Sequence, residues 1–197
     1  MKSTFLAMAL APLAANSLVA ETWVPDPDHT EVVIRWTHAG LSMPTAKFLR
    51  ADGTLDFTPG DIAGAKADFS VFVDSLDAGV PQFTSDLKSS DYFDAETYPA
   101  IRFVSTSVEQ TGEMSVRATG DLTVKDVTGP VTFDITVHGL GAHPLGQFAA
   151  RYAGDWLGMT ATATISRSAF GMGAFVPIGS DEVDITVTTE MRAGGFK

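Results

Sequence analysis

The sequence contains no cysteine among its 197 residues. This absence excludes disulfides, thiolate nucleophiles and cysteine-based metal sites, and it also excludes a lipid-modified cysteine near the N-terminus. A protein without such cross-links depends on its hydrophobic core, and a chain of this length can bury roughly 70% of its unfolded surface. We therefore expect one domain with a large core.

Basic residues are scarce, because 13 Lys and Arg stand against 24 Asp and Glu. One of them, Lys2, lies in the first twenty positions. Residues 21–197 therefore hold 12 basic and 24 acidic residues, and their net charge is near −12. Phosphate binding needs clustered Lys and Arg, so nucleic acid is excluded as a partner. An anionic membrane would repel this surface, and we expect any membrane contact to be transient and to use a small apolar patch.

Long apolar runs are confined to the N-terminus, MKSTFLAMALAPLAANSLVA. One Lys, an apolar middle and small residues before Ala20 predict a cleaved signal peptide over residues 1–20. No later run approaches the ~20 apolar residues of a membrane helix. The sequence thus predicts a soluble protein, exported to the periplasm, with a single domain over residues 21–197.

From about residue 30 onward, apolar and polar residues alternate with a period of two, which is typical of half-buried antiparallel strands. The clearest segments are EVVIRWTH (31–38), KADFSVFVD (66–74), VTFDITVHG (131–139), MTATATIS (159–166) and EVDITVTTE (182–190). Weaker candidates cover residues 45–58, 100–108 and 113–125, which gives eight or nine strands in all. Residues 84–99 carry too many Ser and Asp for a sheet, and we expect one or two short helical turns there, ended by Pro99.

This pattern predicts an all-β protein, either a barrel or a sandwich. An eight-stranded antiparallel barrel would be just wide enough inside to hold one slender ligand.

Motifs for catalysis and metal binding are absent from the sequence. The four histidines, at positions 29, 38, 138 and 143, show no metal-ligand spacing, and GLSMP at residues 40–44 lacks the second Gly of a nucleophile elbow. We therefore expect no catalysis, no metal and no cofactor.

Two polar residues fall on the apolar side of their strands. His38 shares a face with Ile34 and Trp36, which predicts either a hydrogen-bonded interior histidine or a contact with a ligand's polar head. Arg167 continues the apolar face of Ile165, where a cation needs a partner. That partner could be Asp181 or Glu182, in a structural salt bridge, or the head of a ligand.

Five segments in order resemble the YceI-like family of exported bacterial proteins over essentially the whole of residues 21–197. They are HAGLS (38–42), SSDYFDAETYPAIRF (89–103), GDLTVKDVTGPVTFDITVHG (120–139), TATATISRSAFGM (160–172) and IGSDEVDITVTTE (178–190). The resemblance implies an elongated, lipocalin-like, eight-stranded barrel around an apolar tunnel. It further implies a long amphiphile as ligand, such as a polyisoprenoid, an isoprenoid quinone or a fatty-acid derivative, and the ability to form a homodimer.

The sequence departs from the family pattern at one end of the expected barrel. Phe83 and Asp86 stand where members commonly have an Arg and a His, and Ala46 replaces a Gly near Pro44. Two polar contacts to a ligand's head are thereby lost, so the identity of the ligand does not transfer.

The resemblance and the alternation together predict a periplasmic, non-catalytic carrier of such a lipid. Two alternatives remain: an enzyme that uses His38 as a base, and a structural or stress-related module with a solid core. The residues predicted to bind ligand are Ile34, Trp36, His38, Phe69, Val71, Phe103, Phe133, Ile135, Ile165, Arg167, Phe170 and Met172.

Overall fold

The computed structural model describes residues 20–196. The predicted signal peptide lies outside these residues except for Ala20. The described chain forms ten strands: β1 (Glu21–His38), β2 (Thr45–Phe48), β3 (Ala51–Thr58), β4 (Asp61–Phe72), β5 (Leu76–Asp77), β6 (Ala100–Gly112), β7 (Ser115–Val124), β8 (Val127–Ala142), β9 (Asp155–Ser166) and β10 (Gly179–Ala193). Between them lie one helix, α1 (Pro81–Lys88), and four 3-10 turns, η1 (Val73–Ser75), η2 (Pro144–Gln147), η3 (Ala150–Tyr152) and η4 (Arg167–Phe170).

Eight of the strands close into an antiparallel barrel. Their order is β10-β9-β8-β7-β6-β4-β3-β1, and the barrel is completed by pairing of β1 with β10. The long strand β1 pairs with β3 at its beginning, over residues 21–23, and with β2 near its end, over residues 32–35. The predicted barrel is therefore confirmed, and closure removes the free sheet edges that a sandwich would leave.

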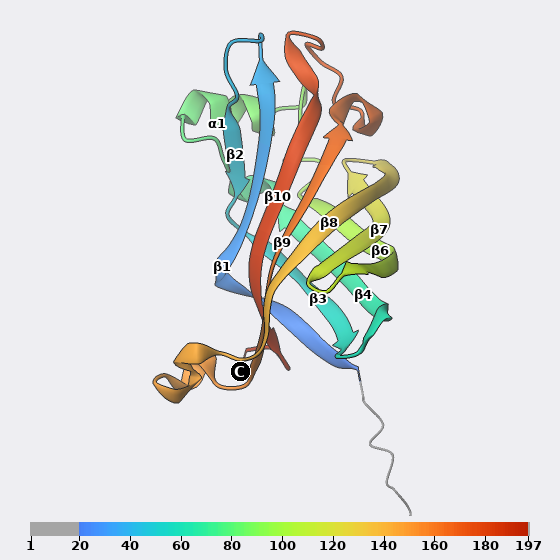
Figure 1. Ribbon diagram of the computed structural model, residues 1–197. Helices are drawn as coiled ribbons and strands as arrows, with labels where there is room; N and C mark the ends of the chain where they lie inside the picture. The colour runs from blue at the N-terminus through green and yellow to red at the C-terminus, as the bar shows by residue number, and fades with distance from the viewer. Residues whose placement is uncertain (1–19, 197) are drawn as a thin grey trace, which may run out of the picture.

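The helical segment differs from the prediction in its limits. Helix α1 begins at Pro81, whose fixed φ suits the first turn of a helix, and it ends at Lys88. The following residues form turns rather than helix, and Asp94 adopts a left-handed backbone with φ of 49°. In Figure 1, α1 lies beside the upper end of the barrel.

Two hydrophobic clusters fill different levels of the barrel. The larger one includes Ile34, Phe48, Leu87 and Phe133, so it joins the strands to α1. The smaller one consists of Trp23, Phe57, Leu157 and Met191 together with partly buried neighbours, and it lies where the beginnings of β1 and β9 meet the ends of β3 and β10. The two clusters thus pack different parts of the barrel wall, and the upper end meets α1 and the loops.

The connection between β8 and β9 leaves the barrel. It carries η2 and η3 and projects from the lower end (Figure 1). Within residues 20–196, no helix has both the length and the apolar character required to cross a bilayer.

Candidate functional site

A cavity of about 940 Å³ occupies the interior of the barrel. Its walls come from inward-facing positions of the strands, from α1 and from the loops at the upper end, and most of the side chains that line it are apolar. Cavities of this size lie at the upper end of the range found for small-molecule sites. The interior is therefore not packed solid. A solid core is what the structural-module hypothesis requires, so the cavity argues against it.

Eleven of the twelve residues predicted to bind ligand line this cavity. They are Ile34, Trp36, His38, Phe69, Val71, Phe103, Phe133, Ile135, Ile165, Arg167 and Met172. The period-two alternation brings nine of them together, because every second side chain of a barrel strand faces inward. Arg167 and Met172 lie in η4 and in the loop after it, beyond the end of β9.

Phe170 does not line the cavity, so its predicted place was wrong. The alternation of β9 ends at Ser166, and η4 then turns the chain. Phe170 is buried in the core, where its ring lies 3.5 Å from the position that a Cβ on Gly129 of β8 would occupy.

Aromatic rings form part of the wall in pairs. Phe103 meets Phe133 edge to face with 5.1 Å between ring centroids, and Trp36 lies 5.5 Å from Phe83 of α1. The ring of Phe103 lies directly over Gly120, where a Cβ would come within 2.6 Å of it. Glycine at this position of β7 therefore allows a large ring to lie flat against the wall.

His38 is exposed at the end of β1, so the prediction of a buried, hydrogen-bonded histidine was wrong. A register shift between Trp36 and His38 interrupts the pairing with β10, and His38 then lies opposite Gly179. The backbone N–H of His38 donates to the carbonyl of Ser42 at 2.9 Å, which closes the hairpin. The side chain consequently lies at the upper mouth of the cavity.

Arg167 is buried, but it does not form the predicted salt bridge with Asp181 or Glu182. Its guanidinium instead donates to four backbone carbonyls, those of Met172, Ala174 (2.8 Å), Gly179 (3.1 Å) and Ser180 (2.8 Å). The loop before β10 curls around the guanidinium and points its carbonyls inward, so it supplies the acceptors that a carboxylate would have supplied. Arg167 therefore fixes the backbone of this loop beside the cavity.

Asp181 has a different partner, Ser168 in η4. Its carboxylate accepts from the backbone N–H and from the hydroxyl of Ser168, each at 2.8 Å. These two hydrogen bonds hold the pKa of Asp181 below its usual value. The hydrogen bonds between Asp181 and Ser168 thus join the two ends of the loop that Arg167 also holds.

The helical segment contributes lining residues that the alternation did not predict. Phe83, Asp86 and Leu87 of α1 line the cavity, as do Ser89, Asp91, Tyr92 and Phe93 in the turns after it. Phe83 and Asp86 are two of the departures from the family pattern, and both line the cavity. An apolar ring and a carboxylate therefore stand where the pattern has Arg and His.

At another part of the wall, β4 and β6 diverge. They pair only over residues 68–72 and 100–104, and beyond this the N–H of Ala67 donates to the hydroxyl of Ser105 instead. The cavity reaches the residues on either side of this divergence, including Ile62, Gln110 and Glu113. Polar side chains therefore line the cavity at this divergence as well as at the mouth, and Thr30 and Thr189 add two hydroxyls to the wall near the bulge of β1.

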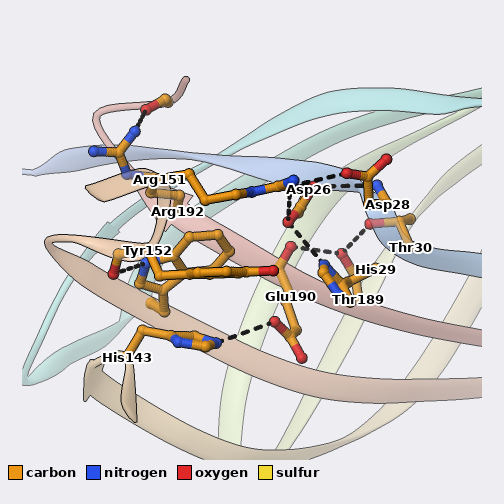
Figure 2. A network of polar contacts seen from close by, with 12 residues as sticks. Asp26, Asp28, His29, Thr30, His143, Arg151, Tyr152, Thr189, Glu190 and Arg192 are labelled. Atoms are coloured by element: carbon orange, nitrogen blue, oxygen red, sulfur yellow. Dashed lines mark hydrogen bonds and ion pairs between the residues drawn. The ribbon is translucent and has the colours of Figure 1, made fainter. Parts of the chain in front are cut away.

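A polar network lies at the lower end, where four residues of β1 bulge out opposite β10 (Figure 2). The carboxylate of Asp26 is fully buried and accepts from Nδ1 of His29 at 2.9 Å and from Arg151 at 3.2 Å. Arg151 also donates to Asp28 at 2.9 Å. The network thus attaches the projecting β8–β9 connection to β1.

The ionisation of Asp26 and His29 follows from these contacts. Burial alone would raise the pKa of Asp26, but the hydrogen bonds from His29 and from the backbone of Asp28, with the charges of His29 and Arg151, lower it overall. The hydrogen bond to Asp26 raises the pKa of His29 above its usual value. His143 extends the network, since it stacks on Tyr152 and lies 3.6 Å from the carboxylate of Glu190.

Nothing in the part of the chain that the structure describes groups three His, Cys, Asp or Glu side chains as a metal site would require.

The family model described as the YceI-like domain matches residues 23–191. Curated relatives include a UPF0312 protein from Pseudomonas putida, which is 32% identical over 176 residues, or 87% of this chain and 88% of that protein. The crystal structure of BcnA from Burkholderia cenocepacia has a TM-score of 0.74 and 26% identity, and the match covers 84% of this chain and 98% of that one.

A further solved structure is described as a polyisoprenoid binding domain from Saccharophagus degradans implicated in plant cell wall breakdown. It has a TM-score of 0.64 at 13% identity, and the match covers 89% of this chain and 99% of that one. At this level of identity the likeness shows the fold alone.

Proposed function

Because the chain belongs to the YceI-like family, we propose that its barrel binds a long apolar amphiphile, with the tail in the cavity and the polar head at the mouth. The candidates are polyisoprenoids, isoprenoid quinones and fatty-acid derivatives. The observation that carries this proposal is the cavity itself, which is lined mostly by apolar side chains and has the polar side chains of His38, Asp86 and Asp91 at its mouth. The solved neighbour described as a polyisoprenoid binding domain supports the same class of ligand.

We further propose a carrier role, in which the protein takes up and releases its lipid in the periplasm without chemical change. Transfer of a tail from water into the cavity is favourable by ~0.8 kcal/mol for each buried methylene. The bilayer offers the tail a medium as apolar as this cavity, so transfer between membrane and protein is nearly balanced. A balanced exchange suits uptake and release by one protein.

The test is native mass spectrometry of the protein purified from the periplasm of a bacterial host, with solvent extraction and mass analysis of what it carries. We expect one apolar adduct per chain. A bare chain that also fails to bind added ubiquinone or polyprenols would contradict the proposal. Recovery of a chemically altered lipid, lost in His38→Ala, would favour the enzyme hypothesis instead.

A further inference from the structure

Two loops at the upper end of the barrel expose large apolar side chains. The β1–β2 hairpin presents Leu41 and Met43, and the loop before β10 presents Phe175, Val176 and Ile178. Leu41 is 88% exposed and Ile178 is 62% exposed. We call these five residues the apolar collar, and Figure 1 shows both loops at the same end of the barrel.

The collar is a fixed surface. The N–H of Ala39 donates to the carbonyl of Ile178 at 2.7 Å, which joins the two loops. Arg167 holds the second loop from inside through four carbonyls. Ala39 and Phe175 both have positive φ, of 54° and 59°, although neither is glycine. Backbone strain of this kind persists only where the surrounding structure imposes it, and it is frequent at functional sites.

The collar is continuous with the cavity. Phe175 and Ile178 are exposed to solvent and also line the cavity, and the ring of Phe175 stacks on Tyr92 of the opposite wall at 6.3 Å. An apolar path therefore runs from the outer surface into the barrel. A lipid tail that followed this path would avoid water if the collar itself were covered by hydrocarbon.

The charge distribution identifies what can cover it. Residues 36–46 and 168–180 contain no Asp, Glu, Lys or Arg, although 19% of the whole chain is charged. Across the mouth, Asp86 and Asp91 line the cavity and bring negative charge close to the collar. An apolar surface with no charged side chain of its own fits a lipid surface of no net charge. Lys125 lies at the same edge, where its ammonium donates to the carbonyl of Ser90, but residues 21–197 carry a net charge near −12, which an anionic surface repels.

We propose that the apolar collar docks the barrel, mouth first, onto a lipid bilayer without net charge, and that the lipid crosses from bilayer to cavity through this contact. This inference rests on the proposed function, because it assigns the route by which the ligand enters.

The experiment measures co-sedimentation of the protein with phosphatidylcholine vesicles and with vesicles that also contain phosphatidylglycerol. The protein is purified after export, so that residues 1–20 do not themselves bind the vesicles. The test variant is Leu41→Ser with Val176→Ser, two exposed positions that do not line the cavity. The matched control is Leu145→Ser with Phe148→Ser, which removes exposed apolar surface at the other end of the barrel.

We expect the wild type and the control to bind phosphatidylcholine vesicles, and the collar variant to bind about tenfold more weakly or worse. Added phosphatidylglycerol should weaken binding of all three. Equal vesicle binding by the collar variant and the wild type, absence of binding by the wild type, or stronger binding to the anionic vesicles would overturn the proposal. A wild type that is dimeric without lipid, and monomeric in the collar variant, would overturn it too, since the collar would then be covered by a second copy.

Binding of ubiquinone presented in detergent is measured in parallel, by quenching of tryptophan fluorescence, to which Trp36 in the cavity wall contributes. The collar variant should bind it as the wild type does, while uptake from vesicles should be slower. If no form binds ubiquinone or another candidate lipid in detergent, the proposed function fails whatever the vesicles show. If all forms bind it and collar substitution changes neither vesicle binding nor uptake, only the docking inference fails.

Discussion

The fully buried carboxylate of Asp26 accepts a hydrogen bond from Nδ1 of His29, three residues later in β1, at 2.9 Å. This pair lies in the bulge of β1 and receives Arg151 from the projecting connection between β8 and β9. A titratable histidine therefore takes part in holding the lower end of the barrel together.

The first prediction concerns pH and His29. Its pKa is raised in the folded protein above the ordinary value of 6.5, so its stabilising effect is complete below 6.5 and is lost as the pH rises through the folded value. The free energy of unfolding should therefore exceed that of His29→Gln by more at about pH 5 than at about pH 9. Urea unfolding across this range measures the difference, and a gap that grows with pH would contradict the assignment.

The second prediction concerns Arg167. A lysine ammonium cannot reach the four carbonyls that the guanidinium joins, so Arg167→Lys should lower the free energy of unfolding by about 2–4 kcal/mol. It should also speed hydrogen exchange in the loop before β10. The control is Arg35→Lys, at an exposed ion pair with Asp184, which should cost under about 1 kcal/mol. Equal costs would show that the buried carbonyl contacts contribute little.

The third prediction concerns Gly120. An added Cβ would lie 2.3 Å from the carbonyl oxygen of Val104 and 2.6 Å from the ring of Phe103. Gly120→Ala should therefore lower the free energy of unfolding by about 1–3 kcal/mol and displace the ring. Gly139→Ala is the matched control, because its Cβ meets nothing within 4 Å, and thermal unfolding should separate the two variants. If Gly120→Ala left the free energy of unfolding unchanged, the ring of Phe103 would be free to move aside.

The fourth prediction concerns the volume of the cavity. Ala161 of β9 faces the cavity, so Ala161→Phe should occupy space that the lipid needs and weaken ubiquinone binding by about tenfold or more. Thr162→Phe adds the same ring at the next, exposed position, where binding should not change. The fluorescence titration measures both, and unchanged binding in Ala161→Phe would place the lipid elsewhere.

The fifth prediction concerns His38 at the mouth. If its imidazole contacts the head of the ligand, His38→Phe should weaken binding of a polar-headed lipid such as ubiquinone and leave binding of the hydrocarbon squalene unchanged. Competition titrations with the two lipids give the comparison. An equal loss for both would assign His38 to the shape of the mouth alone.

Much of the barrel could be predicted from local pattern. Alternation in residues 131–139 and 159–166 placed Phe133, Ile135 and Ile165 on the inner face, and the closed barrel confirms that orientation. The pattern was sufficient because a strand has only two faces, and the apolar one is buried.

The prediction failed where the alternation ended. Phe170 follows a 3-10 turn and left the cavity wall, and His38 lies beyond a register shift and became exposed. The lining residues of α1, Phe83 among them, lie in a short segment whose position depends on what it packs against. Neither Asp26 nor Arg151 stood out, since 125 positions separate them in the sequence.

The sequence by itself thus determined the all-β class, the inward faces of the strands and the acidic, cysteine-free character of the chain, because these follow from composition and from a period of two. Only the tertiary structure decided that the interior holds a cavity, that Arg167 binds carbonyls instead of a carboxylate, and that two uncharged loops meet beside the mouth. These features depend on closure of β1 against β10, which joins the two ends of the chain, and no local pattern encodes such a long-range contact.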